Sequence, residues 1–586
     1  MNRLVGIIAW LGCAVVIVGC LGPVLGDWNG SVIGPFGAVD AALQSGILEW
    51  SARSAGLTTA WRDLPIFYPT PGMIGAMDSL LGQAWLIIPW RLVADLTVAS
   101  QYNLAMLLSL ILAGLATGGL VVAGGGSRWS AGVAALVLIG SPYTLSQVGH
   151  LNQLPPPLVM TALSCLLIGL RRWSEDRRGG VAWWGMGLSL ALQPAWGWYG
   201  FAYAVLGCGV IVVVWTWRHL ADRSLQIGGR RRFPWTALPP LLLAVTVVWW
   251  FAQPQLDMQQ RHDSFTRGLD AVRYSSADIQ HFADQGAYRS GPQDWFGHGK
   301  TGTERYEGRD RQVLHPGWGA LAFTLIGWLG RRRLPLMRRR VGSSMLAIGC
   351  VGLILAFGDS IGLPGTDRRL PLPLSWLREL VPAFEAYRAV WRFSFLAVIG
   401  MAWWSAVGAD VMIDWASRPG SLGSPRRLRS TMPILLVILT VVLSLPATLP
   451  VLTIPFDGRA LTDAGGGGEP VLCLPSVINP LTSDVTEAFW NHRALEIGQP
   501  VSGGATGWRP DSTVDLHRSL RECEDGRGDG AALLRSQQHA GFILAEIVIR
   551  EGDDERVRYW RNMLQGIGAT PISPWPRDGY ETWRLP

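Results

Sequence analysis

Long apolar runs alternate with short polar connections along most of this chain. Eleven of the runs are long enough to cross the ~30 Å hydrocarbon core of a bilayer as helices. They lie near residues 4–26, 101–124, 130–148, 154–170, 181–196, 198–217, 235–252, 316–330, 344–358, 393–414 and 431–449. The apolar run 80–98 is interrupted by Pro89, Arg91 and Asp95, which predicts an interfacial or re-entrant segment instead of a span. The pattern therefore predicts a polytopic α-helical membrane protein of about eleven transmembrane helices.

Arginines are concentrated in the short connections between these runs. The connections 125–129, 171–180, 218–234, 331–343 and 415–430 contain 20 arginines and only three acids, Glu175, Asp176 and Asp222. With eleven spans, all five connections and Arg3 fall on one side of the membrane, and short Arg-rich loops stay in the cytoplasm. The N-terminus is therefore predicted in the cytoplasm and the C-terminus outside.

Composition agrees with a membrane protein. Of 586 residues, 49% are hydrophobic and 30 are tryptophan, and the mean hydropathy is +0.24. The net charge of +7 follows from the Arg-rich connections, and no aromatic-basic reader module accompanies them. The predicted partner is thus the lipid bilayer and not a nucleic acid. The apolar run in residues 1–26 exceeds a signal-peptide core, so it predicts a retained first helix.

Four segments on the predicted outer side are long: 27–100, 253–315, 359–392 and the tail from 450 to 586. The tail follows a different pattern from the rest, because strand-like and helical stretches alternate in it. These stretches lie at 470–474, 485–497, 514–522, 541–549, 555–567 and 581–585. The prediction is a transmembrane module at 1–449 followed by an extracytoplasmic α/β domain at 450–586.

The seven cysteines do not form a metal-binding pattern. Five lie in the predicted spans, and the chain has no CxxC or His-rich spacing. Cys473 and Cys523 lie in the tail, where oxidation is chemically allowed if the tail is outside, and we predict that they can pair.

Candidate chemistry begins with the acids of the first outer segment, Asp27, Asp40 and Asp78. Carboxylates are costly at a membrane surface unless they have partners or a function. Such a group can take a proton from a hydroxyl as a general base, or it can bind a divalent cation such as Mg²⁺ or Mn²⁺. Asp27 and Asp40 are the candidate metal ligands. For any single acid, the alternative is an interfacial cap or an ion pair with Arg53, Arg62 or Arg91.

Cations are expected where a phosphate leaves. Arg388 and Arg392 precede the run 393–414 and share a face if their segment is helical. Paired guanidinium groups at a membrane surface suit a lipid phosphate. The alternative is that both side chains snorkel to lipid headgroups.

Aromatic and amide side chains gather at other predicted outer helix ends. The segment 141–153 contains His150 and Gln153, the segment 193–199 contains Tyr199, and Tyr68 lies in the first outer segment. Stacked rings with amides suit a sugar, which has apolar faces and hydrogen-bonding edges. The same aromatics equally suit an interfacial belt.

Several short motifs follow one another in a recognisable order. They are Gly26-Asp27, Ile66-Phe67-Tyr68-Pro69, Leu80-Leu81-Gly82, Tyr102-Asn103-Leu104, Ser141-Pro142-Tyr143, His150-Leu151, Leu192-Gln193, Tyr274-Ser275-Ser276-Ala277-Asp278, Pro316-Gly317, Tyr387-Arg388 and Arg392-Phe393. This order, which runs from the first span to about residue 415, resembles the bacterial YfhO-type membrane proteins of the GT-C glycosyltransferase superfamily.

The resemblance implies an inverting glycosyltransferase of the bacterial inner membrane. Its donor would be a polyprenyl-phosphate-linked sugar, and its acceptor an envelope glycan, lipid or protein on the outer face. By this analogy an acid of the first outer loop, Asp27 or Asp40, is the base or metal ligand, with Asp78 in support. Related sequences often have Glu-His before the Leu-Leu-Gly motif, whereas this chain has Asp78-Ser79.

Two other functions fit parts of the pattern. A transporter or flippase of lipid-linked glycans predicts charged or broken helices within the spans. A non-catalytic glycan assembly factor predicts outer carboxylates that do not converge on one cavity.

Overall fold

The structure is a computed structural model. It describes residues 2–33, 38–54, 62, 64, 72–175, 177, 179–221, 235–261, 269–277, 281–282, 313–362, 369–381, 384–385, 387, 389–417, 426–444, 451–453, 471–474, 516, 518–520, 522–523, 527–539, 542, 544–548, 554–571 and 580–586, although some side chains within these ranges, including those of Asp40 and Cys473, lie outside the description.

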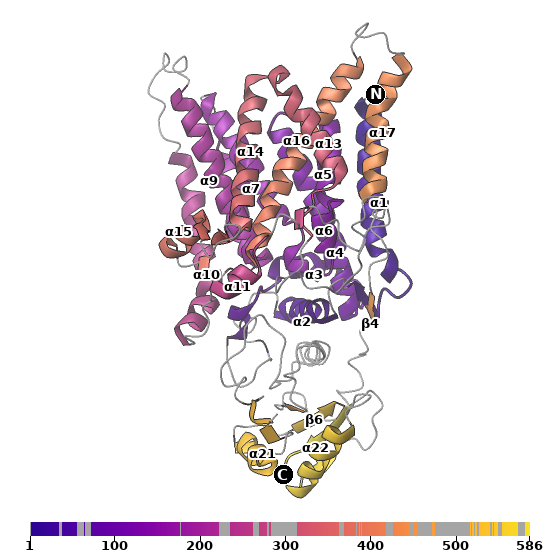
Figure 1. Cartoon of the computed structure of the whole chain (residues 1–586), viewed down its shortest axis with the longest axis vertical. Coiled ribbons are helices and arrows are strands. Elements are labelled where there is room, and N and C mark those ends of the chain that lie inside the picture. The colour runs from indigo at the N-terminus through magenta and orange to yellow at the C-terminus, as the bar shows by residue number, and fades with distance from the viewer. Residues whose placement is uncertain are drawn as a thin grey trace.

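Each of the eleven predicted apolar runs contains a helix, and these helices form an upright bundle (Figure 1). They are α1 (Asn2–Leu21), α4 (Val98–Ala123), α5 (Arg128–Ile139), α7 (Pro157–Ser174), α8 (Gly180–Trp196), α9 (Trp198–Ala221), α10 (Leu238–Arg261), α13 (Trp318–Leu329), α14 (Leu336–Ala356), α16 (Phe395–Ser417) and α17 (Arg426–Ser444). Within the described residues, seven helices are long and apolar enough to cross a membrane: those of α1, α4, α7, α9, α10, α14 and α16. The exact number of spans therefore stays a prediction.

Short helices cover one end of the bundle. They are α2 (Ala38–Ser54), α3 (Leu81–Arg91), α6 (Pro142–Ser146), α11 (Leu269–Tyr274) and α15 (Pro373–Leu380), together with 3-10 turns such as η3 (Met73–Ala76), η4 (Leu151–Gln153) and η11 (Val390–Ser394). The helix α3 contains Pro89 and has only 11 residues, about 16 Å at 1.5 Å per residue. It is too short to span a bilayer, in agreement with the predicted interfacial segment.

The centre of the bundle is α16, which is buried on almost all sides. It packs against α13, α14, α5 and α17. Its approach to α13 is close, because a Cβ atom on Gly408 would lie 2.0 Å from the carbonyl oxygen of Phe323. Small residues allow this main-chain contact between membrane helices.

The described residues of the Arg-rich connections lie at the opposite end of the bundle, where the N-terminus lies in Figure 1. Arg338 donates to Asp410 over 2.5 Å, and the same carboxylate accepts from Ser127 Oγ over 2.6 Å. Arg218 donates to Ser343 over 2.7 Å. These contacts join three of the five predicted inner connections to one another and to the end of α16, so the grouping predicted from charge agrees with the fold.

The C-terminal part contains a four-stranded mixed sheet of order β5-β6-β8-β7. Its strands are β5 (Val471–Leu474), β6 (Leu544–Val548), β7 (Thr570–Pro571) and β8 (Tyr580–Arg584), and β5 and β6 are parallel. Helices α21 (Gly530–His539) and α22 (Asp554–Gly566) pack on it around Trp560 and Trp583. Figure 1 shows this layer beyond the end of the bundle that carries α2 and α3.

One strand pairing connects the tail to the first outer segment. The strand β4 (Val451–Thr453), which follows α17, is antiparallel to β1 (Ser31–Ile33). The predicted division of the chain at residue 450 stays a prediction, and so does the pairing of Cys473 with Cys523, because the Cys473 side chain lies outside the described residues.

Candidate functional site

Asp78 lies in the connection before α3, where elements from distant parts of the chain meet its carboxylate. Asn152 Nδ2, in η4, donates to Asp78 Oδ2 over 2.7 Å. The backbone N–H of Trp198, at the start of α9, donates to Asp78 Oδ1 over 2.9 Å. Gln44 of α2 donates in turn to Asn152 Oδ1 over 3.1 Å. Asp78 is thus a half-buried carboxylate at the junction of α2, η4 and α9.

The break between α8 and α9 makes this arrangement feasible. Gly197, between the two helices, has a φ of +151°, which strongly favours glycine. A Cβ atom there would lie 3.1 Å from the Asn152 carbonyl oxygen and 3.8 Å from Asp78 Oδ1. The glycine therefore lets the chain turn next to the carboxylate and present the Trp198 N–H to it.

Arg392 lies among aromatic rings of the same region, and its charge acts on the Asp78 carboxylate. Its Cζ atom is 4.8 Å from the centre of the Tyr199 ring and 5.4 Å from that of Trp391, both within cation–π range. Tyr387 donates from its hydroxyl to the Trp198 carbonyl over 3.0 Å, and Tyr199 Oη accepts from the Ala389 N–H over 2.9 Å. These bonds attach the segment before α16 to the start of α9.

Burial and neighbouring charges change the pKa of two side chains in this region. Burial raises the pKa of Asp78, while the hydrogen bonds from Trp198 and Asn152 and the charge of Arg392 lower it in part. Burial also raises the pKa of Tyr387, and the neighbouring Tyr199 and Asp78 raise it further. Asp78 can therefore hold or take a proton at a higher pH than an ordinary aspartate.

Asp27 lies in a different environment from that of Asp78. Asp27 is exposed and accepts from Ser31 Oγ over 2.5 Å. Its turn is held by the start of α4, since Thr97 Oγ1 donates to the Asn29 carbonyl over 2.7 Å. Thr97 follows the C-terminal end of α3, whereas Asp78 precedes its N-terminal end. The described contacts therefore do not bring Asp27 and Asp78 together.

Three predicted site residues cannot be placed. Tyr68 and Arg388 lie outside the described residues, and Asp40 has only its backbone described, in α2. Of the remaining substrate-binding candidates, His150 is half-buried directly before η4, and Gln153 is buried in it. Both thus flank Asn152. Tyr199 and Arg392 form the stacked pair described above.

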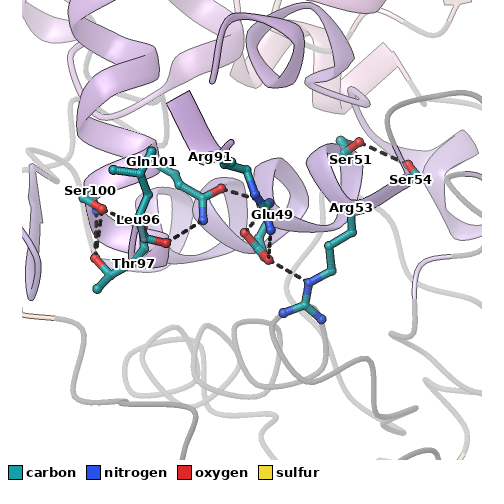
Figure 2. A network of polar contacts seen from close by, with 9 residues as sticks. All are labelled: Glu49, Ser51, Arg53, Ser54, Arg91, Leu96, Thr97, Ser100 and Gln101. Atoms are coloured by element: carbon teal, nitrogen blue, oxygen red, sulfur yellow. Dashed lines mark hydrogen bonds and ion pairs between the residues drawn. The ribbon is translucent and has the colours of Figure 1, made fainter. Parts of the chain in front are cut away.

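Sequence reasoning did not select Asn152 and Tyr387 as site residues, although both stand beside residues that it did select. It also did not select Glu49, the centre of a second polar network (Figure 2). Glu49 is buried and pairs with Arg53 over 2.6 Å and with Arg91 over 2.9 Å. Arg91 also donates to Gln101 over 3.2 Å. Glu49 and Arg53 are four residues apart in a predicted outer segment, and this spacing indicates an ion pair on one face of a helix.

This network joins α2, the C-terminal end of α3 and the start of α4. A cavity of about 420 Å³ lies beside it and is lined by residues 91–96. Because Glu49 compensates Arg91 with two hydrogen bonds, the network holds the short helices together.

The described side chains contain no group of three or more His, Cys, Asp or Glu residues that could hold a metal ion. The described side chains leave the predicted Mg²⁺ or Mn²⁺ site a prediction. The Asp40 carboxylate is not among them, and no step below uses a metal.

The bundle has the fold of a solved glycosyltransferase, and seven of its described helices are long and apolar enough to cross a membrane. Its structure is similar to that of the arabinofuranosyltransferase AftD from Mycobacteria, with a TM-score of 0.54 and 14% sequence identity over 98% of this chain. This chain spans only 40% of the length of AftD.

Two more distant structures are also similar. The oligosaccharyltransferase AglB from Archaeoglobus fulgidus, solved with an inhibitory peptide and a dolichol-phosphate, has a TM-score of 0.49 at 13% identity over 96% of this chain and 73% of its own. ArnT from Cupriavidus metallidurans, solved with undecaprenyl phosphate, has a TM-score of 0.43 at 12% identity over 98% and 97%. No family model and no curated protein sequence match the chain. The YfhO-type resemblance therefore stays a prediction, and the structural likeness shows the fold alone.

Proposed function

We propose that this protein is a membrane glycosyltransferase that moves a sugar from a polyprenyl-phosphate donor to a hydroxyl-bearing acceptor. The observation that supports this most directly is the half-buried Asp78 carboxylate, with its raised pKa, near the ring-stacked Arg392 guanidinium. A base and a phosphate-binding cation are the two groups that the reaction requires. The GT-C fold agrees with this reaction.

In the proposed mechanism, Asp78 accepts the proton of the acceptor hydroxyl as the oxygen attacks the anomeric carbon of the donor. The bond between that carbon and the phosphate oxygen breaks, and its electron pair leaves with the polyprenyl phosphate. Arg392 stabilises the negative charge of the leaving phosphate. Attack opposite the leaving group inverts the anomeric configuration.

This assignment changes the ranking of the predicted acids. Asp27 is exposed and lies in a local turn with Ser31, so we assign it a structural role in the first outer segment. Asp78 combines burial, oriented hydrogen-bond donors and a nearby cation. Asp40 remains a candidate for a supporting role, as do Tyr68 and Arg388 for substrate binding.

The topology is part of the proposal. The Arg-rich end of the bundle faces the cytoplasm of a bacterial inner membrane, and the C-terminal domain and Asp78 face outward. The donor then reaches the site from the outer leaflet. The acceptor is an envelope glycan, lipid or protein.

The test is a transfer assay with the purified full-length protein in nanodiscs and synthetic undecaprenyl-phosphate hexoses and pentoses as donors. Membrane extract supplies acceptors, and mass spectrometry detects release of undecaprenyl phosphate together with the glycosylated product. Release that depends on the protein and on Asp78 supports transfer. Movement of intact donor between leaflets without release supports the flippase alternative, and binding without either supports a non-catalytic assembly factor.

A further inference from the structure

Four glutamines surround the Asp78 junction, and all of them are buried. Gln44 of α2 and Gln153 of η4 are each 7% exposed, and Gln83 of α3 and Gln193 of α8 are 0% exposed. We call these four residues the amide shell. The chemistry proposed above uses none of their side chains, and only Gln153 was a substrate-binding candidate from the sequence.

Contacts show that the amide shell is a single cluster. Gln83 Nε2 donates to the carbonyl oxygens of Leu151 and Trp196, over 3.2 and 3.1 Å. Gln44 donates to Asn152, and Gln153 follows Asn152 in the same turn. Gln193 lies in the last turn of α8, where a Cβ on Gly200 would come within 2.2 Å of its Nε2. The four residues thus lie together near the junction of α8 and α9.

Each glutamine of the amide shell has a buried amide atom without a hydrogen-bond partner among the described residues. These atoms are Gln44 Oε1, Gln83 Oε1, Gln153 Nε2, Gln193 Nε2 and Gln193 Oε1. A buried polar atom that loses its water and gains no partner destabilises the fold. Buried polar groups are normally paired, so five exceptions in one cluster indicate that a polar ligand supplies the missing partners.

The charge of Asp78 determines which amide atoms of the shell remain without a hydrogen-bond partner. An ionised carboxylate only accepts, so Asn152 must turn its NH₂ group toward Asp78 and its oxygen toward Gln44. Gln44 must then donate with Nε2, which leaves its oxygen unpaired. Gln83 is oriented in the same way by two carbonyl acceptors. The shell therefore presents three acceptors and two donors.

Another buried glutamine, outside the amide shell, provides a contrast. Gln101 is 2% exposed, and both of its amide atoms are paired. Its Oε1 accepts from Arg91, and its Nε2 donates to the Leu96 carbonyl over 3.1 Å (Figure 2). Burial alone therefore does not leave a glutamine amide unpaired in this protein.

We propose that the amide shell binds the hydroxyl groups of the donor sugar and selects a neutral sugar. A hydroxyl both donates and accepts, so it can satisfy either end of an amide. The shell has no formal charge, and Asp78 and Arg392 beside it have opposite charges. An ammonium or carboxylate on the sugar would be desolvated against the amides, which provide no counter-ion. This inference rests on the proposed function and names its substrate class.

The test compares Gln193→Met with Gln101→Met in the full-length protein in nanodiscs. The ligands are undecaprenyl-phosphate mannose, its 2-amino-2-deoxy and uronic acid analogues, and undecaprenyl phosphate without a sugar. Intrinsic tryptophan fluorescence reports binding, and thermal melting reports stability. Methionine has nearly the shape of glutamine but has no amide to satisfy.

Loss of two neutral hydrogen bonds in Gln193→Met should weaken binding of the mannose lipid by about tenfold, and binding of the sugar-free lipid by less than about twofold. Its melting temperature should stay the same or rise, because two unpaired buried atoms are removed. Gln101→Met should melt lower and bind the mannose lipid normally. The wild type should bind the mannose lipid more tightly than either charged analogue.

Equal binding of the mannose lipid by Gln193→Met and the wild type would overturn the inference and leave a structural role only. Equal or tighter binding of a charged analogue would overturn the selection of neutral sugars. Failure of the wild type to bind even sugar-free undecaprenyl phosphate would instead count against the proposed function itself, so the two failures are distinguishable.

Discussion

Asn152 donates from Nδ2 to Asp78 Oδ2 over 2.7 Å, which connects residues that are 74 positions apart in the chain. This hydrogen bond distinguishes Asp78 from Asp27, the other candidate acid of the first outer segment whose side chain is described. It also orients the Asn152 amide toward Gln44 and thereby connects the carboxylate to the amide shell. The predictions below test this connection and the scaffold around it.

Asp78→Asn should lower sugar transfer by about 100-fold or more, since a positioned general base contributes about 10²–10⁴-fold. Asp27→Asn should change transfer by less than about threefold, because an exposed asparagine can still accept from Ser31. The measurement is the release of undecaprenyl phosphate at matched membrane abundance. A large loss in Asp27→Asn with little loss in Asp78→Asn would return the base to Asp27.

The rate should depend on pH through Asp78. The carboxylate form accepts the proton, and burial raises its pKa, so kcat/KM should rise with pH over a range above that of an ordinary aspartate. Arg392 lowers this pKa. Arg392→Gln should therefore move the rising limb to still higher pH, in addition to reducing the rate.

The pH profiles of the wild type and Arg392→Gln provide the measurement. An unchanged limb in Arg392→Gln, with only the amplitude reduced, would show that the arginine acts on the phosphate without affecting Asp78.

Gly197→Ala should reduce transfer by at least about tenfold, because small displacements of catalytic groups cost this much or more. The added Cβ would press on the Asn152 carbonyl and strain a backbone with a φ of +151°. Gly209→Ala in α9 is the matched control, since a Cβ there meets nothing within 4 Å. Similar losses in both variants would contradict the specific role of Gly197.

Glu49→Gln should lower the free energy of unfolding by roughly 2 kcal/mol, because Arg91 would lose its buried counter-ion. Arg53→Ala should cost about 0.5 kcal/mol or less, since Arg53 is 43% exposed and solvent screens its ion pair. Melting of the two variants in the same detergent compares them. Equal melting temperatures would show that the Glu49 network does not hold α2 to α3 and α4 (Figure 2).

The helical bundle was predictable because lipid leaves main-chain groups no partner outside the chain. An apolar run of sufficient length must then pair its own N–H and C=O groups as a helix. For this reason each predicted run contains a helix, and Pro89 indicates the short α3. The pairing of β1 with β4 was not predictable, because it joins Ser31 to Thr453 and no local pattern specifies such a partner.

The candidate site was predictable only in part. Tyr199 and Arg392 were selected separately, as a sugar-stacking ring and a phosphate-binding cation, and the fold places one over the other. Asp27 and Asp78 were both candidate acids, because an aspartate in an outer segment has the same formal chemistry wherever it lies. Burial and hydrogen-bond donors distinguish them, and both come from other parts of the chain.

By itself, the sequence determined the class of the protein: an α-helical membrane bundle with its arginines at one end. Hydrophobicity and charge act locally, and each run or connection carries its own signal. Only the tertiary structure decided which carboxylate is affected by the charge of Arg392 and which glutamines are left with unpaired amides. Those properties depend on desolvation and on partners far apart in the chain, and they arise only when α2, α3, η4, α8 and α9 pack together.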